Sequence, residues 1–179
     1  MAFFELPSDD ELTPEVRQML EEYCRLLGHD QVPVGWRAFA RLPKIIQARF
    51  TGFHNFFHQC RFPWDVKNLA WMLIAHMKGC QVCFSYSRSR LDKLGWDQAM
   101  LDSVCAKPES LPLKGRDRAF VQYALRLATD PGQAKLKDFR EMEAAGLSKD
   151  EILETIAFAA CANMHMTFTL SQVGWLAEE

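Results

Sequence analysis

The sequence predicts an all-α protein, and three observations support that prediction. Proline, glycine and small polar residues stand where helices start and stop, as at Thr13-Pro14 and Gly28. Stretches that alternate apolar and polar residues are absent, and so are the Asn-Gly or Asp-Gly pairs of tight hairpins. No repeat, low-complexity stretch or linker divides the chain. We therefore expect a single multi-helix domain over residues 1–179.

Helix signals divide the first half of the chain into four segments. For the first segment, Thr13 provides an N-cap, Pro14 a first-turn proline and Gly28 a stop. Later prolines and glycines bound the other segments in the same way. The predicted helices cover residues 14–27, 43–60, 64–78 and 80–94.

The next part of the chain contains start and stop signals for three further helices. Asp97 can cap a short helix that ends near Ala106, and prolines then bracket a loop. Two further helices are expected over residues 115–129 and 134–145.

The last helix has the clearest start signal. Ser148 and Glu151 form a capping box, and Leu147 with Ile152 can form a hydrophobic staple. The segment that follows, residues 152–175, is apolar on most faces. We therefore expect it to be buried within the protomer or at a subunit interface.

Composition and charge exclude two classes of partner. The chain has 21 Lys and Arg against 23 Asp and Glu, so it lacks the positive charge that nucleic-acid binding needs. The longest apolar run, residues 69–75, is far shorter than the roughly 20 residues of a membrane span. The acidic start of the chain shows no basic region followed by an apolar stretch. We expect a cytoplasmic protein that binds neither nucleic acid nor membrane.

Cys80 and Cys83 form a CxxC motif directly after Gly79, at the predicted start of a helix. Thiols at this spacing can close a disulfide within one helical turn, and the helix dipole stabilises a thiolate at the N-terminus. A thiolate with a second thiol beside it is what thiol–disulfide and peroxide chemistry require. The other four cysteines are far apart in apolar surroundings, where reduced thiols are expected. The pair is therefore the leading candidate for a redox site.

Two groups of residues occur together in one known superfamily. A Leu- and Ala-rich helix precedes Gly79 and the CxxC motif, and Leu94-Gly95 follow it. Near the C-terminus, residues 145–152 (AGLSKDEI) precede a long apolar helix. In these features the chain resembles the AhpD-like (carboxymuconolactone decarboxylase) superfamily of all-α proteins, whose members include peroxidases of the alkylhydroperoxidase AhpD type.

The resemblance covers about residues 41–179, and residues 1–40 look like an atypical N-terminal helical extension. It implies an AhpD-like multi-helix bundle with the CxxC motif at the N-terminus of a helix. By this analogy Cys83 would form the sulfenic acid, and Cys80 would be its proton donor and disulfide partner. Helix-dipole reasoning alone makes Cys80 the more acidic thiol, so the order of attack stays open.

The proton relay of the superfamily does not carry over to this sequence. Its active pattern has a Glu twelve residues before the first cysteine and a His four residues after the second, and these positions hold Asn68 and Ser87. A His sometimes found just before the second cysteine is Val82 here. General acid–base assistance is worth roughly 10²–10⁴ in rate, so a site without it would be slow or would do different chemistry.

Three residues are candidate auxiliary groups for the cysteine pair. His76 stands four residues before Cys80, but Gly79 is expected to interrupt the helix between them. Tyr86 lies one helical turn beyond Cys83, and His165 lies on the terminal helix. Packing or a local hydrogen bond is the simpler interpretation for each. Four basic residues near the motif would either lower the thiol pKa values or form a solvated helix face; they are Lys78, Arg88, Arg90 and Lys93.

His54 and His58, with Cys60 nearby, form a second cluster that could carry chemistry. Two His at i and i+4 can bind zinc, but the residues between them include no Glu, and the aromatic neighbours favour a packed helix. A second CxxC or CxxH that would complete a zinc site is absent, as are a P-loop, a dinucleotide fingerprint and a GxSxG elbow. We expect no metal and no cofactor, and a metal-binding protein is the weakest alternative.

The leading functional hypothesis is a thiol-dependent peroxidase or thiol–disulfide oxidoreductase that cycles Cys80 and Cys83 between dithiol and disulfide. Its partners would be a hydroperoxide or disulfide substrate and a reductant protein or small thiol. The alternative is a non-enzymatic or redox-sensing protein that uses the fold for oligomerisation or binding. A lactone decarboxylase is less favoured, because that branch generally lacks the CxxC motif. With five Trp and thirteen Phe on short helices, the chain is expected to form a homo-oligomer, either dimer, trimer or hexamer.

Overall fold

Nine α-helices build residues 5–176, the part of the chain that the computed structural model describes, with side chains described as far as residue 172. No strand occurs within these residues, so the predicted all-α class is confirmed. The helices are α1 (Pro14–Leu27), α2 (Val34–Phe39), α3 (Pro43–Phe53), α4 (Trp64–Lys78), α5 (Gln81–Lys93), α6 (Gln98–Ala106), α7 (Gly115–Thr129), α8 (Leu136–Ala144) and α9 (Lys149–Leu176).

The capping residues act as the sequence predicts. The Val16 N–H donates to the Thr13 hydroxyl at the start of α1, and Gly28 ends this helix in the left-handed conformation with φ 65°. At the start of α9, the Ser148 N–H donates to the Glu151 carboxylate at 2.8 Å and the Glu151 N–H to the Ser148 hydroxyl at 3.3 Å. The predicted capping box is thus formed in full.

Three elements differ from the prediction in detail. α2 was not predicted, because it is short and its N-cap, Pro33, offers no side-chain cap. α3 gives way at His54–Gln59 to a π-helical segment instead of continuing as a regular helix. α8 begins at Leu136 because the preceding Pro131–Gln133 forms a separate 3₁₀ turn.

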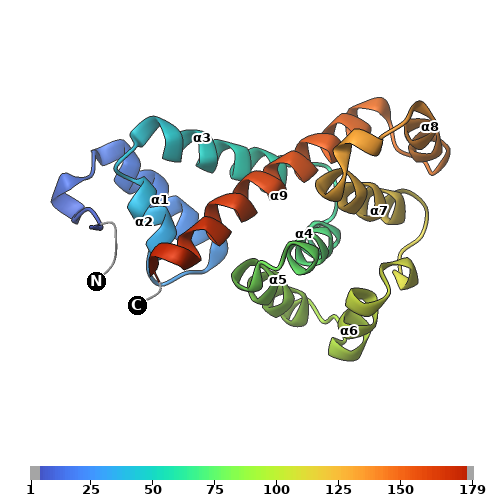
Figure 1. The fold of residues 1–179 in the computed structure, drawn as a ribbon, viewed down its shortest axis with the longest axis horizontal. Coiled ribbons are helices and arrows are strands. Elements are labelled where there is room, and N and C mark those ends of the chain that lie inside the picture. Colours follow the sequence, from blue (N-terminus) through green and yellow to red (C-terminus); the bar gives the residue numbers. More distant parts are fainter. Residues whose placement is uncertain (1–4, 177–179) are drawn as a thin grey trace.

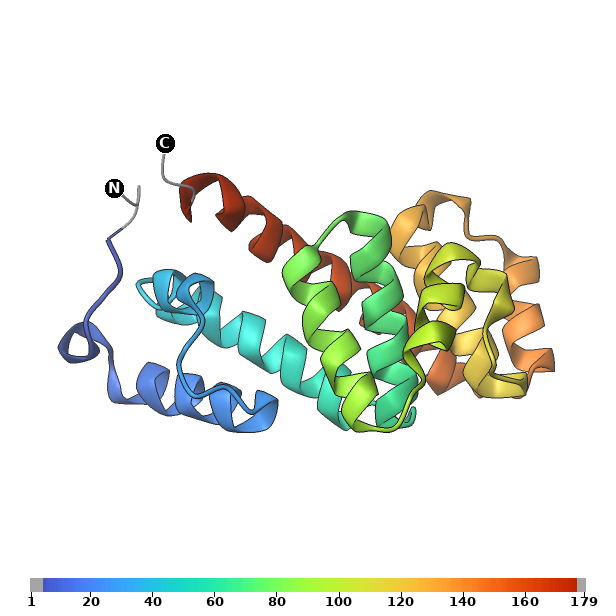
Figure 2. The same ribbon diagram turned by 90° about the horizontal axis from the view of Figure 1, so that it is seen from below.

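α4 is the central helix of the molecule. Every residue from Val66 to Ala75 is buried, because α4 packs against α5, α7 and α9. α4 and α5 lie side by side as an antiparallel pair, as both ribbon views show (Figures 1 and 2). The CxxC motif is therefore held at one end of the best-packed part of the fold.

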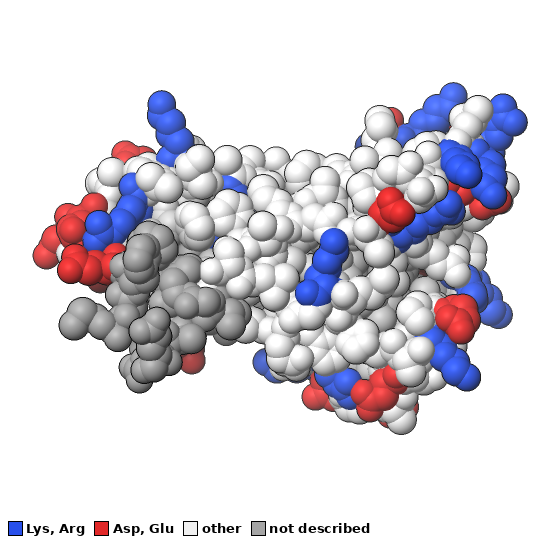
Figure 3. Space-filling view, in the orientation of Figure 1, with Lys and Arg blue, Asp and Glu red and all other residues white. Residues whose placement is uncertain are grey.

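α9 runs diagonally across the whole molecule, from α7 and α8 at one end to α2 at the other (Figure 1). One of its sides is buried, whereas Leu153, Ile156 and Leu170 remain exposed to solvent. On the face seen in Figure 3, charged side chains gather toward the two ends of the molecule and the middle is largely uncharged. The last helix thus contributes to the core and also exposes several apolar side chains.

None of the helices described here combines the length and the hydropathy required to cross a lipid bilayer.

Candidate active site

The CxxC motif lies at the junction between α4 and α5. Gly79 ends α4 in the left-handed conformation with φ 71°, which residues with a side chain rarely adopt, and the chain reverses there. Cys80 then occupies the N-cap of α5, and its N–H donates to the Ala75 carbonyl at 2.9 Å. The structure therefore places the motif at the N-terminus of a helix, as predicted.

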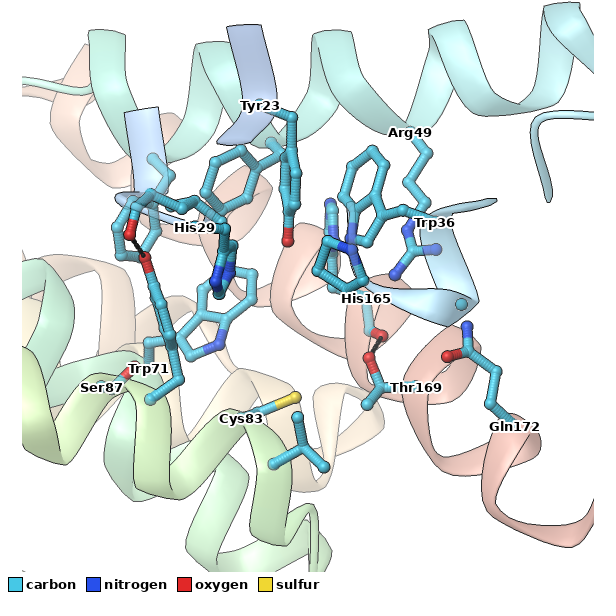
Figure 4. Close-up of a pocket in the computed structure, with 17 residues that line it drawn as sticks. Tyr23, His29, Trp36, Arg49, Trp71, Cys83, Ser87, His165, Thr169 and Gln172 are labelled. Atoms are coloured by element: carbon cyan, nitrogen blue, oxygen red, sulfur yellow. Dashed lines mark hydrogen bonds between the residues drawn. The ribbon is translucent and has the colours of Figure 1, made fainter. Parts of the chain in front are cut away.

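The two cysteines of the motif have different surroundings. Cys80 is 1% exposed and belongs to the hydrophobic core. Cys83 is half-buried, and its sulfur points into a cavity (Figure 4). Both thiols are reduced in the structure. A molecule bound in the cavity would therefore meet Cys83 first.

The pKa values of the two thiols move in opposite directions. A hydrogen bond from the Cys83 thiol, and to a smaller extent one from the Cys83 backbone N–H, stabilises the Cys80 thiolate and lowers the pKa of Cys80 to about 7 despite burial. The same hydrogen bond, followed by burial and the charge on Cys80, raises the pKa of Cys83. In the structure the Cys80 side chain makes no capping hydrogen bond. The hydrogen bonds from Cys83 therefore become strong when Cys80 is a negatively charged thiolate. The pair therefore holds one thiolate near neutral pH and shares the remaining proton.

The cavity beside Cys83 has a volume of about 200 Å³, and its walls are mostly apolar. Val82 lies at its edge and is 66% exposed, so the cavity reaches the surface next to the motif. The lining residues come from α1, α2, α3, α4, α5, α9 and the segments between them, and they are Tyr23, Leu27, His29, Pro33, Gly35, Trp36, Arg49, Phe53, Phe57, Trp71, Val82, Cys83, Tyr86, Ser87, His165, Thr169 and Gln172.

The first 40 residues supply one wall of this cavity. The rings of Tyr23 and Trp36 pack with their centroids 3.8 Å apart, and the Tyr23 hydroxyl points into the cavity (Figure 4). Gly35 allows α2 to approach α9 closely, since a Cβ at this position would collide with the Gln172 amide. The N-terminal segment is thus part of the candidate site, a role that sequence analysis did not assign to it.

The structure brings two of the three candidate auxiliary residues into the cavity. Tyr86 lines the cavity, its hydroxyl donates to the Leu27 carbonyl at 2.9 Å, and burial raises its pKa. His165 also lines the cavity, and burial followed by the charge of Arg49 lowers its pKa to about 3, so its ring is neutral. Its Nε2 atom is buried without a hydrogen-bond partner. His76, in contrast, is exposed beside Phe84 and lies outside the cavity.

The four basic residues near the motif have other roles than tuning the thiols. Arg88 forms an ion pair with Asp102, and Arg90 donates to the Leu26 carbonyl. Lys78 and Lys93 are exposed. The interpretation as a solvated and structural helix face therefore fits them better than the interpretation as pKa-lowering groups.

The positive charge that acts on Cys83 belongs to Arg49 of α3, a residue that sequence analysis missed. Arg49 is 2% exposed and lines the cavity. The signal was present in the sequence, because Arg49 stands between Ile46 and Phe53 on the apolar stripe of its helix. A charged residue on an apolar stripe becomes buried, and a buried charge is costly unless it has a partner of opposite charge or a hydrogen bond.

His54 and His58 lie next to each other on the π-helical segment His54–Gln59. Their ring centroids lie 5.7 Å apart, and burial together with neighbouring positive charge lowers the pKa of His58 to about 4. His58 packs between Phe53 and Trp64. In the described part of the chain no three His, Cys, Asp or Glu side chains converge as metal ligands, so a zinc site here would lack its third ligand.

Several solved structures have a fold similar to that of this chain. No protein-family model matches the chain, and no curated protein matches it. A peroxidase-related protein of uncharacterised function from Silicibacter sp. TM1040 superposes with a TM-score of 0.79 at 16% identity, over 96% of this chain and 90% of that one. An alkylhydroperoxidase AhpD core protein from Ralstonia eutropha JMP134 gives the same TM-score and identity over 95% and 89%. The chain has the AhpD-like fold.

A cysteine-to-alanine variant of the debrominase Bmp8, solved in complex with 2,3,4-tribromopyrrole, is a further structural neighbour of this chain. It superposes with a TM-score of 0.75 at 15% identity, over 97% of this chain and 90% of that one. These neighbours confirm the fold that the sequence predicts.

Asn68 and Ser87, which replace the relay residues of the AhpD-like pattern, are both buried and both carry an oxygen without a partner. Asn68 donates from its amide to the Trp64 carbonyl at 2.8 Å, which leaves its Oδ1 unsatisfied. Ser87 lines the cavity one turn beyond Cys83, with its Oγ unsatisfied. Neither side chain ionises near neutral pH, so neither can carry a proton as a carboxylate or an imidazole would.

Proposed function

We propose that this protein is a thiol-dependent reductase that reduces an organic hydroperoxide through Cys83 and Cys80. The proposal rests on one observation, a cavity-facing Cys83 beside a buried Cys80 of lowered pKa. Such a pair provides a nucleophile, a base and a resolving thiol within one helical turn. The AhpD-like fold of peroxidase-related neighbours supports the same chemistry.

The first step forms a sulfenic acid on Cys83. The Cys80 thiolate takes the proton of Cys83, the Cys83 sulfur attacks the terminal oxygen of the hydroperoxide, and the O–O bond breaks. The alkoxide that leaves takes the proton from Cys80 and departs as an alcohol. Cys80 is thus a thiolate again, and it replaces the absent relay as the proton carrier.

The second step closes the disulfide. The Cys80 thiolate attacks the sulfenic sulfur of Cys83, and hydroxide leaves and is protonated to water. The balance of the two steps is one hydroperoxide and two thiols giving one alcohol, one water and one disulfide. An external dithiol, either a reductant protein or a small thiol, must then supply two electrons to restore both thiols.

The test compares the wild-type protein with Cys83→Ser in the consumption of cumene hydroperoxide, with dithiothreitol as reductant. Wild type is expected to consume the hydroperoxide and Cys83→Ser to lose this activity. Cys105→Ser is the matched control, because Cys105 is a half-buried thiol that lies on α6 outside the cavity. Equal consumption by wild type and Cys83→Ser would overturn the proposal.

A second candidate function is reductive dehalogenation of a small aromatic ring. The aromatic walls of the cavity, with Trp36, Phe53 and Trp71, favour it, and Bmp8 is a debrominase of similar structure. Here Cys83 would remove the halogen from a ring carbon that gains a proton, and Cys80 would displace halide to form the disulfide. Halide release from a bromopyrrole, measured with both proteins of the previous test, separates this function from peroxide reduction.

The remaining alternative is a redox-sensing protein without turnover. It predicts a reversible change of assembly on oxidation, which gel filtration with and without reductant measures. We also propose a homo-oligomer, since α9 exposes the apolar side chains of Leu153, Ile156 and Leu170. Light scattering tests this, and a monomer at all concentrations would contradict it. We propose the cytoplasm as the compartment, where the cysteines of this chain would stay reduced.

A further inference from the structure

Arg49 is a buried cation that has no anionic partner among residues 5–172. It is 2% exposed, and its Nε and Nη1 atoms are buried without a hydrogen-bond partner. No carboxylate within residues 5–172 forms an ion pair with it, whereas eight ion pairs occur elsewhere in this part of the chain. Burial lowers the pKa of Arg49 to about 10, so the guanidinium is charged at neutral pH.

Aromatic rings hold the faces of this guanidinium and leave its edge free. Its central carbon lies 4.2 Å from the ring centroid of Trp36 and 4.7 Å from that of Phe168. Stacking of this kind engages the faces of the group, while its N–H donors lie in the plane. The contacts fix the position of Arg49 and leave its hydrogen-bonding capacity unused.

Other unused polar groups surround Arg49 in the cavity. The Nε2 of Gln172 and the Nε2 of His165 are both buried without partners. Figure 4 shows the guanidinium of Arg49 and the amide of Gln172 on one side of the cavity, with the Tyr23 hydroxyl and the Cys83 sulfur facing the same space. One side of the cavity therefore holds a positive charge and the unused N–H donors of Arg49 and Gln172, beside the Nε2 of the neutral His165 ring, which can accept a hydrogen bond.

We propose that this side of the cavity binds the carboxylate of a small aromatic acid, with Arg49 as its counter-ion and Gln172 as a second donor. A cavity of about 150 Å³ accepts benzene, so the present one, of about 200 Å³, accepts a single ring that carries a carboxylate. Phe53 and Trp71 of the cavity lining provide apolar contacts for the ring, and the end opposite the carboxylate faces Cys83 of the same lining. That this end is reduced there rests on the proposed function, whereas binding of the carboxylate does not.

The cost of an unpaired buried charge supports a role in binding. Such a charge destabilises the folded protein, and replacing it with an apolar side chain of similar size is often neutral or stabilising. A merely structural arginine would lower stability when it is removed. The two roles therefore predict opposite results for the same substitution, Arg49→Met.

The experiment measures binding of 4-methylbenzoate and of its neutral isostere 4-methylbenzamide by titration calorimetry. The protein is the Cys83→Ser variant, so that turnover plays no part. Because hydrogen bonds to charged groups contribute about 1.5–3 kcal/mol, we expect the carboxylate to bind roughly 10- to 100-fold more tightly than the amide. A further Arg49→Met substitution should bring the affinity for the carboxylate down to that for the amide. Its melting temperature should be equal or higher, and Arg49→Lys should restore only part of the preference.

Two outcomes would overturn the proposal: equal affinity for carboxylate and amide, or an unchanged preference for the carboxylate in Arg49→Met. Should Arg49→Met not fold, the comparison of the two probes with Arg49 intact remains decisive. Selective binding without hydroperoxide consumption by the wild-type protein would refute the proposed function and leave the carboxylate site standing. Consumption of hydroperoxide without selective binding of the carboxylate would support the proposed function and refute the carboxylate site.

Discussion

The cavity has two sides of different chemistry, which we call the sulfur wall and the arginine wall. The sulfur wall is Cys83 with Cys80 behind it, on the tightly packed α4–α5 pair. The arginine wall is Arg49 and Gln172, on α3 and α9, and α2 packs against it through Gly35. In the proposed reaction the first wall exchanges protons and electrons, whereas in the proposed binding the second holds a charge in place.

This difference means that the proposed reaction and the proposed recognition belong to separate parts of the chain. The pKa of Cys80 is set mainly by Cys83, within the sulfur wall itself. Arg49 contributes least among the influences on the pKa of Cys83, after Cys80, burial and Thr169. Substitutions on one wall should therefore leave the property of the other largely unchanged.

The largest effect is expected from Cys80→Ser, which removes the resolving thiol and the base of the sulfur wall. Hydroperoxide should oxidise Cys83 to a sulfenic acid that persists, because no thiol in the cavity can close the disulfide. Multiple turnover should be lost. Dimedone labelling followed by mass spectrometry would detect the sulfenic acid, and a normal catalytic cycle in this variant would contradict the assigned role of Cys80.

A gain of activity is expected from Ser87→His, which returns an imidazole to the sulfur wall one turn beyond Cys83. Because general acid–base assistance contributes about 10²–10⁴ in rate, turnover should rise at least about tenfold, with some loss of stability from the larger side chain. Ser89→His is the matched control, since Ser89 is exposed on the same helix. The same gain in both variants would show that the cavity position is irrelevant.

The pH dependence of thiol alkylation tests whether Cys80 and Cys83 of the sulfur wall share a proton. The pKa of Cys80 is lowered to about 7, so the fraction of thiolate in the pair rises with pH and levels off above neutrality. An unperturbed thiol would level off only above about pH 8.5. Iodoacetamide should modify Cys83, the more accessible sulfur, and its profile should shift to higher pH in Cys80→Ser. An unshifted profile would mean that the two thiols do not share a proton.

The smallest effect is expected from Gly35→Ala, which acts on the arginine wall alone. The added Cβ collides with the flexible end of Gln172 and displaces its amide. Binding of 4-methylbenzoate should weaken severalfold, and the alkylation rate of Cys83 should stay as in wild type. Gly132→Ala is the control, because Gly132 lies outside the cavity and a Cβ there meets only ordinary contacts. A changed alkylation rate in Gly35→Ala would show that the walls are coupled.

Local signals in the sequence predicted the position of the CxxC motif at the N-terminus of a helix. A capping residue or a helix-ending glycine acts on its immediate neighbours, so Thr13, Gly79 and Ser148 could be interpreted without knowledge of the fold. The CxxC motif is local in the same sense. What stayed open from sequence, the order of attack, depends on which sulfur meets the cavity, and the structure places Cys83 there.

The arginine wall could not be predicted, because its members are distant in sequence. Arg49 and Gln172 meet only when α9 crosses the molecule to reach α2 and α3. The charged residue on the apolar stripe of α3 was a visible anomaly, but its meaning needs the aromatic rings of Trp36 and Phe168. The four basic residues near the motif drew attention by sequence proximity, which says little about where a side chain points.

The position of Gly35 against Gln172 has a consequence for how such proteins diversify. The helices α1 and α2 form a panel on one side of the cavity; α1 accepts hydrogen bonds from Tyr86 and Arg90 of α5, and neither helix includes the α4–α5 junction that carries the thiols. Exchanging that panel for another of different shape would alter which molecules are admitted and leave the electron chemistry intact. Variation among proteins of this architecture should accordingly concentrate in the first 40 residues when their substrates differ.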